Sequence, residues 1–153
     1  GNHDLAYLYE DLPTCRNSIE HAEKIKSLFT DNLDLFKLAG VLEDKYLFSH
    51  AGITSYWLEE TQQTLDDLCT KSLDDIRGLG MVGYQRYGLF KTGSVVWCDI
   101  YEFAEDPARP YFQIFGHTQM MKEYIADNWA CLDCRHCFIL DSDTSKITKL
   151  END

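Results

Sequence analysis

Three histidines in the sequence stand in similar local surroundings. His3 lies in a Gly-Asn-His-Asp sequence, His50 in Ser-His-Ala-Gly and His117 in Gly-His-Thr. The second and third each follow a short apolar stretch that predicts a buried strand, and open α/β sheets place ligand sites just beyond the carboxyl ends of their strands. A single histidine at such a position is more often structural. Three in one pattern, with an asparagine and an aspartate beside them, predict a metal site with an acid catalyst next to it.

A group of thiols near the end of the chain offers an alternative metal site. Its spacing suits zinc or an iron–sulfur cluster, and the residues are Cys131, Cys134 and Cys137, with His136 as a further nitrogen ligand. Such sites usually take ligands from a second, matching element, and the sequence contains no second Cys-x-x-Cys. The same stretch is also typical of a strand, a tight turn and a second strand, over 129–132 and 137–140.

The histidine pattern resembles a known family. The Gly1-Asn2-His3-Asp4 sequence matches the Gly-Asn-His-Asp/Glu signature of the calcineurin-like metallophosphoesterases, and His50-Ala51-Gly52 and Gly116-His117-Thr118 match their two later histidine motifs in order. Trp97-Cys98-Asp99 is similar to the Leu-Trp-x-Asp segment of the phosphoprotein phosphatase branch, which includes serine/threonine phosphatases and diadenosine tetraphosphatases. The resemblance covers the chain from Gly1 to about His117. It implies a layered α-β-β-α fold and metal-dependent hydrolysis of phosphoesters.

The resemblance also implies a role for each motif residue. Asn2, His50 and His117 would bind one metal of a two-metal centre. His3 would be the general acid that protonates the leaving alkoxide, and Asp4 would accept a hydrogen bond from His3 and so fix its tautomer.

Substrate binding and the nucleophile follow from the same resemblance. Arg86 would contact the phosphate, because a guanidinium group suits phosphate oxygens. Two divalent transition metals, Mn, Fe or Zn, would activate a bridging hydroxide as the nucleophile. The expected partner is a phosphoester, either a phosphoprotein or a nucleotide polyphosphate.

Two motifs of the family are missing from this sequence. It contains neither Asp-x-His nor Gly-Asp-x-x-Asp, which would supply the ligands of the other metal. We therefore expect residues 1–153 to form the C-terminal part of a single metallophosphoesterase domain that lacks its N-terminal strands. Such a chain would be inactive alone, bind at most one metal weakly, and associate with itself through an exposed sheet edge.

The elements that position these residues are predicted from hydrophobic periodicity and turn signals. We expect a helix from Ser18 with Asn17 and Glu20 as its capping box, a short helix from Leu33 to near Gly40, and a long helix over 57–76. Strands are expected over 46–48, 94–98 and 111–115, with a loop over 81–92. The last part, 124–150, is expected to be a meander of strands with a turn at 142–145. Residues 54–92, between the two later histidine motifs, would form a helical cap that bears specificity. Helices and buried strands together predict a layered α/β fold.

Composition narrows the possible partners. The 153 residues include 26 Asp and Glu against 14 Lys and Arg, for a formal charge of −12. Such a charge argues against nucleic-acid polymers and anionic membranes as ligands. The absence of an apolar run of about 20 residues argues against a membrane span. We therefore expect a cytoplasmic phosphatase-like protein, and the alternative is a degenerate, phosphatase-like binding module in which the histidines are relics.

Overall fold

A five-stranded mixed sheet forms the centre of the computed structural model, which describes residues 1–13 and 18–150. Its strands, in spatial order, are β1 (Ala39–Leu42), β2 (Tyr46–Ser49), β3 (Phe112–Phe115), β5 (Trp129–Cys131) and β4 (Tyr124–Ile125). The β2, β3 and β5 strands run parallel to one another, while β1 and β4 pair antiparallel at the two edges. The protein is therefore a mixed α/β structure, as the sequence predicts.

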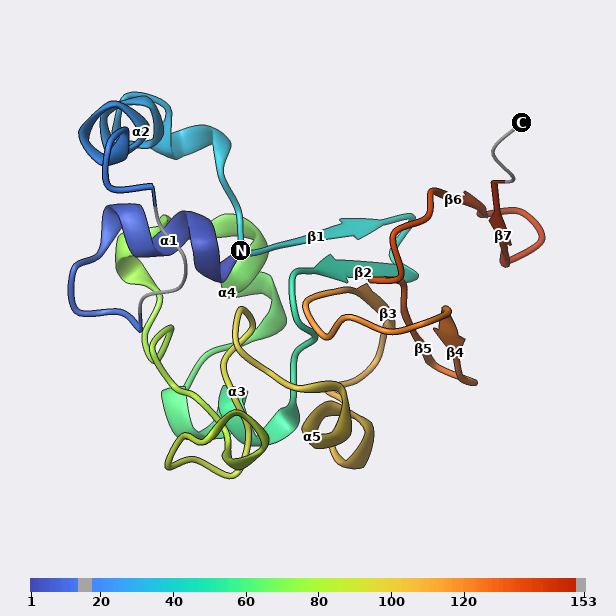
Figure 1. Ribbon diagram of the computed structural model, residues 1–153. Helices are drawn as coiled ribbons and strands as arrows, with labels where there is room; N and C mark the ends of the chain where they lie inside the picture. Colours follow the sequence, from blue (N-terminus) through green and yellow to red (C-terminus); the bar gives the residue numbers. More distant parts are fainter. Residues whose placement is uncertain (14–17, 151–153) are drawn as a thin grey trace.

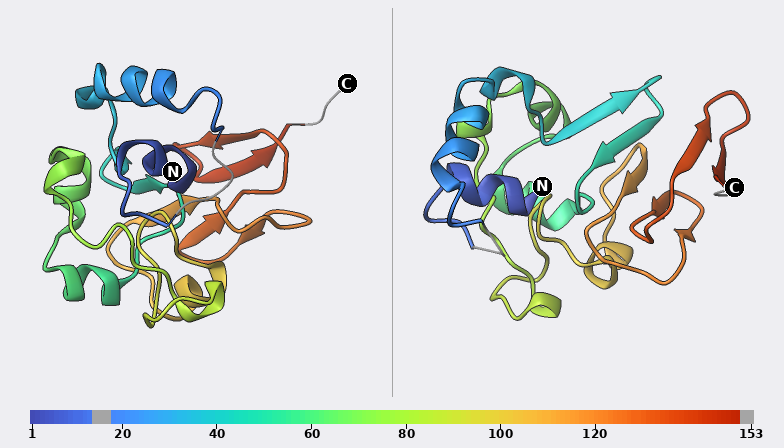
Figure 2. Two further views of the ribbon diagram at one scale, coloured as in Figure 1. Left: turned by 60° about the vertical axis from the view of Figure 1, so that its left-hand side comes forward. Right: turned by 45° about the horizontal axis from the view of Figure 1, so that its top comes forward.

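Short helices surround this sheet. They are α1 (Asn2–Leu8), α2 (Ala22–Thr30), α3 (Ser55–Thr61), α4 (Leu65–Thr70) and α5 (Ile100–Glu105), with 3₁₀ turns at Leu33–Leu35, Leu73–Asp75 and Tyr84–Arg86. Figures 1 and 2 show α1, α2 and α4 gathered on one side of the sheet, with the separate hairpin of β6 (Phe138–Asp141) and β7 (Lys146–Lys149) at its far side. None of the helices found in residues 1–13 and 18–150 combines the length and the apolar character needed to cross a bilayer.

Two hydrophobic clusters hold the helices against the sheet. The larger cluster includes Leu47 of β2 and Trp57 of α3, both fully buried. The smaller one lies under α5, where the ring of Phe103 packs 4.3 Å from Phe115 and 5.5 Å from Trp129, measured between ring centroids. Burial of large aromatic side chains is a main source of stability in a domain of this size.

The predicted long helix over 57–76 is wrong, because the structure has α3, α4 and a 3₁₀ turn in that region. The first break is at Gln62, whose backbone is left-handed with φ 53° and ends α3. Two residues later, Thr64 begins α4 with a capping box formed with Asp67. Cap residues thus override a hydrophobic periodicity that is continuous along the sequence.

The predicted strand over 94–98 is also wrong. The amide groups of Trp97 and Cys98 both donate to the carbonyl of Ser94 at 2.9 Å, so this segment is a buried turn. A short apolar run indicates burial, but it does not by itself distinguish a strand from another buried conformation.

Other predicted elements are confirmed in whole or in part. The strands at 46–48 and 111–115 correspond to β2 and β3, and the turn at 142–145 joins β6 to β7. The helix predicted from Ser18 begins at Ala22, and its proposed cap Asn17 lies outside the described residues. Of the helix predicted over 33–40, only a 3₁₀ turn forms, since Gly40 belongs to β1. Of the expected hairpin over 129–140, the strands β5 and β6 form but belong to different sheets.

Candidate metal and phosphate site

Two neighbouring parallel strands deliver the two later histidines to one place. His50 directly follows β2, and Gly116 and His117 directly follow β3. The amide of Gly116 donates to the carbonyl of His50 at 2.9 Å, so the ends of the two strands are tied together. The carboxyl ends of adjacent parallel strands thus form the site, as expected from the sequence.

Donor atoms of Asn2, His50 and His117 converge at this edge. The Nε2 atom of His50 lies 2.9 Å from Oδ1 of Asn2 and 3.0 Å from Nδ1 of His117. The Asn2 side chain is buried and comes from the first turn of α1. Gly1 allows this approach, because a Cβ atom at Gly1 would lie 2.5 Å from the His50 ring. His50 therefore contacts both of the other residues that the sequence predicts as ligands of one metal.

His117 is held in an unusual backbone conformation. Its φ of 65° lies in the left-handed region, which is uncommon for residues other than glycine. Its Nδ1 atom faces His50, while its Nε2 atom is buried and has no hydrogen-bond partner among the described residues. A left-handed backbone at a residue other than glycine is typical of functional sites, where the surrounding structure fixes one conformation.

Both imidazoles are neutral at physiological pH. Burial and, as the second cause, the positive charge of the amino-terminal group lower the pKa of His50 from 6.5 to about 4. Burial also lowers the pKa of His117 to about 3, with a second contribution from the Arg86 guanidinium. A neutral imidazole presents the nitrogen lone pair that binds a metal, so no bound proton has to leave first.

The donor set fits a divalent transition metal. Two ligand atoms about 2.1 Å from one ion and at right angles to each other are about 3 Å apart, which agrees with the observed separations. Within residues 1–13 and 18–150, no three His, Cys, Asp or Glu side chains are grouped to hold a metal. A metal held here would therefore need the amide oxygen of Asn2 as its third donor, and three donors would leave coordination positions open.

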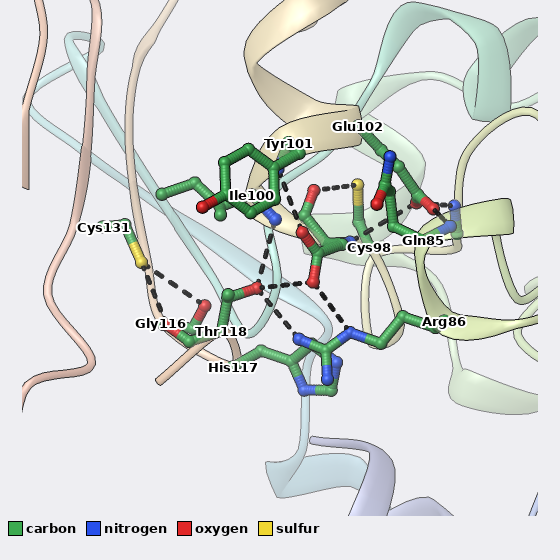
Figure 3. Close-up of polar contacts among 12 residues, drawn as sticks. Gln85, Arg86, Cys98, Ile100, Tyr101, Glu102, Gly116, His117, Thr118 and Cys131 are labelled. Carbon is green, nitrogen blue, oxygen red and sulfur yellow. Dashed lines mark hydrogen bonds and ion pairs between the residues drawn. The ribbon is translucent and has the colours of Figure 1, made fainter. Parts of the chain in front are cut away.

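Arg86 lies beside the pair of His50 and His117 and is not a freely solvated surface residue. It ends a 3₁₀ turn in the loop over 81–92, and its Nε atom forms an ion pair with Oδ2 of Asp99 at 3.1 Å. Its Nη2 atom donates to Oγ1 of Thr118 at 3.0 Å. Figure 3 shows Arg86, Thr118 and His117 close together, and Thr118 is the residue after His117. The guanidinium is thus fixed next to the imidazoles.

His3 and Asp4 occupy exposed positions in the first turn of α1. The charge of His3 contributes to lowering the pKa of both His50 and His117, which places His3 within electrostatic reach of them. The Asp4 carboxylate accepts a hydrogen bond from the amino group of Gly1 at 2.6 Å. Consecutive residues on a helix do not face each other, so this geometry gives no support to the expected bond between His3 and Asp4.

The cysteine group is not assembled as a metal site in the described residues. Cys131 and Cys134 are buried, whereas Cys137 is exposed. The thiol of Cys131 donates weakly to the carbonyls of Gly116 and Thr118 at 3.8 and 3.7 Å, so it packs against the turn that carries His117. Its contacts in this structure are those of a packing residue.

Sequence reasoning missed the support around Arg86. Asp99 and Thr118 stand in motif segments that give them no role toward Arg86, and Glu102 lies outside the motifs. The available signal was the spacing of Asp99 and Glu102, which is that of a capping box and predicts a helix start directly after the Trp-Cys-Asp segment.

Comparisons with known proteins add no family assignment to this geometry. Neither the models of protein families nor the curated proteins give a match to the chain.

Proposed function

We propose that this protein binds a divalent transition metal through Asn2, His50 and His117 and takes part in metal-dependent hydrolysis of a phosphoester. The convergence of Oδ1, Nε2 and Nδ1 at 2.9 and 3.0 Å carries the proposal. We also propose that the mixed sheet belongs to a layered α-β-β-α metallophosphoesterase fold. The positions of His50 and His117 at the ends of parallel neighbours support this assignment.

The bound metal would act as a Lewis acid on a phosphoryl oxygen and lower the pKa of a coordinated water. Arg86 would donate hydrogen bonds to the phosphate from the guanidinium edge that faces away from Asp99. A water would give up one proton to solvent, and its oxygen would form a new bond to phosphorus while the ester P–O bond breaks. His3 would give its proton to the departing ester oxygen, which leaves as an alcohol.

The positive charge needed to attract an anionic substrate would be local. The chain carries a formal charge of −12, but Arg86 and a bound cation would both lie at the site. Phosphoproteins and nucleotide polyphosphates both fit this chemistry, since each presents a phosphoryl group.

Titration with Co²⁺ tests the proposal directly. Absorption in the visible region would report cobalt bound to nitrogen and oxygen ligands, and calorimetry would give the affinity and the number of ions bound. We expect one ion per chain, with binding weakened at least about tenfold in His50→Ala and His117→Ala, because each loses one of three ligands. His21→Ala is the matched control, since His21 is exposed at the start of α2.

A second measurement separates the enzyme from a binding module. The metal-loaded chain is expected to bind inorganic phosphate, and Arg86→Met should weaken that binding while leaving the Co²⁺ affinity unchanged. Equal Co²⁺ binding by the chain and by His117→Ala would refute the metal site. Metal binding without phosphate binding would refute the proposed catalytic role and favour a phosphatase-like module.

A further inference from the structure

A buried carboxylate organises the loop that carries Arg86. Glu102 lies in the first turn of α5 and is only 6% exposed. Its Oε1 atom accepts from the amide of Gln85 at 2.8 Å, and its Oε2 atom accepts from the amide of Gly93 at 2.9 Å. One side chain therefore anchors both ends of the segment over 85–93.

The loop is built closely around this carboxylate. A Cβ atom at Gly83 would overlap the Glu102 carboxylate, so glycine permits the contact. Across the loop, Gly88 donates to the carbonyl of Gly83 at 2.9 Å, and Tyr84 donates to the carbonyl of Phe90 at 3.0 Å. These contacts leave the backbone around Arg86 little freedom.

The guanidinium group of Arg86 is held by a residue at the start of the same helix, α5. Asp99 precedes α5, and its Oδ1 atom caps the helix by accepting from the amide of Tyr101 at 3.1 Å. Its Oδ2 atom is the partner of Arg86 Nε. Figure 3 shows Gln85 and Glu102 at one end of this network and Arg86, Thr118 and His117 at the other.

We infer that Glu102 is a positioning residue, which holds the loop over 83–93 so that the Arg86 guanidinium is presented to a phosphate beside His117. This inference rests on the proposed function for the phosphate itself, although the placement of Arg86 can be measured without any ligand. Asp99 fixes the guanidinium at its Nε side, and Glu102 fixes the backbone from which the side chain extends.

At position 102, a glutamate can accept hydrogen bonds on both of its side-chain oxygens, whereas a glutamine cannot. Both carboxylate oxygens face N–H donors, so a glutamine at this position would set its own NH₂ group against one of those amides. Glu102→Gln therefore releases one end of the loop with little change in volume. Glu102→Asp keeps the charge but shortens the side chain by one methylene, and Glu105→Gln changes an exposed carboxylate of the same helix as the control.

The test uses the ¹⁵N-labelled chain, in which the Nε–H signal of Arg86 is identified by its loss in Arg86→Lys. In the unsubstituted chain and in Glu105→Gln we expect a heteronuclear NOE typical of an ordered side chain. In Glu102→Gln we expect that NOE to be lost, and phosphate affinity of the Co²⁺-loaded chain to fall about tenfold with Co²⁺ affinity unchanged. Glu102→Asp should give a smaller change of the Arg86 NOE and of phosphate affinity in the same direction. If Glu102→Gln fails to fold, the Glu102→Asp measurement decides whether Glu102 positions Arg86.

The outcomes separate the two proposals. A folded Glu102→Gln chain that keeps an ordered Arg86 signal, even with lowered stability, overturns the positioning role, as does equal mobility of Arg86 in all variants. Failure of the unsubstituted chain to bind phosphate overturns the proposed function, while the Arg86 signal still decides whether Glu102 positions the arginine.

Discussion

The buried side-chain amide of Gln113 should be a main support of the segment that follows His50. Gln113 lies on β3 and is 1% exposed. Its Oε1 atom accepts from the amide of Ile53, and its Nε2 atom donates to the carbonyls of Ile53 and Ala108, all at 2.9 Å. Because Ile53 is three residues after His50, the Gln113 side chain connects β3 to the segment that leads away from His50.

The cost of removing the amide follows from these contacts. In Gln113→Met the side chain keeps its length but loses all three bonds. The carbonyl of Ile53 still accepts from the amide of Ala108 at 2.9 Å, so two backbone groups lose the partner seen here: the Ile53 amide and the Ala108 carbonyl. An unsatisfied buried group costs about 1–3 kcal/mol, and added apolar burial returns about 1 kcal/mol. With two such groups, the free energy of unfolding should fall by about 1–5 kcal/mol.

Urea unfolding followed by tryptophan fluorescence measures this change, with Gln119→Met as the control. Gln119 is exposed, so its replacement should change the free energy of unfolding by less than about 0.5 kcal/mol. If the two variants unfold at the same urea concentration with the same slope, the assignment of Gln113 as a buried bridge is refuted.

Two further perturbations probe the same part of the molecule. Stability of the metal-free chain should fall as the pH drops below 6.5, because the unfolded chain takes up protons on His50 and His117 while the folded chain does so only near pH 4 and pH 3. By pH 5 we expect a loss of about 2 kcal/mol for the pair, after allowing for solvent screening of these partly exposed rings. Gly52→Ala should cost about 2–4 kcal/mol, since φ is 86° and the new Cβ would lie 2.5 Å from Cδ2 of Phe103. Gly40→Ala, where nothing lies within 4 Å of the added atom, should be close to neutral.

Urea unfolding at pH 7.5 and pH 5 checks the predicted pH dependence of stability, with the double variant His50→Gln/His117→Gln as its control. That variant should show a flatter dependence on pH, and an equal slope would mean that other groups dominate. For the glycines, thermal unfolding of both variants is sufficient. A Gly52→Ala chain as stable as Gly40→Ala would contradict the close packing of Phe103 against residue 52.

Short buried strands were predictable because their signal is local. The stretches that form β2 and β3 are apolar runs that end at glycine-containing turns, and burial in a parallel sheet favours such runs. The end of α3 at Gln62 could not be predicted, because the left-handed conformation of this residue is set by the caps on either side and by packing rather than by residue type. The turn over 94–97 was equally hidden, since an apolar run reports burial and not backbone direction.

The site was predictable to the extent that its residues follow strands. The sequence places His50 and His117 at strand ends, and a parallel sheet then makes them neighbours. The network of Glu102 and Asp99 was not predictable in this way. It depends on carboxylates at the start of α5 that contact the loop over 85–93, and no periodicity in the sequence encodes that contact.

The pairing of β2 with β3 brings His50 and His117 together independently of the length of chain that joins the two strands. Adjacent strands are about 4.8 Å apart whatever the length of chain that joins them. The distance between the two imidazoles is therefore a property of the sheet, not of the intervening residues 51–111. Insertions in exposed turns of that connection, away from its buried side chains and from Arg86, Asp99 and Glu102, would change the groups that approach the two imidazoles while leaving His50 and His117 in place. Under the proposed function, such changes would alter which phosphoester is bound without moving the proposed metal ligands.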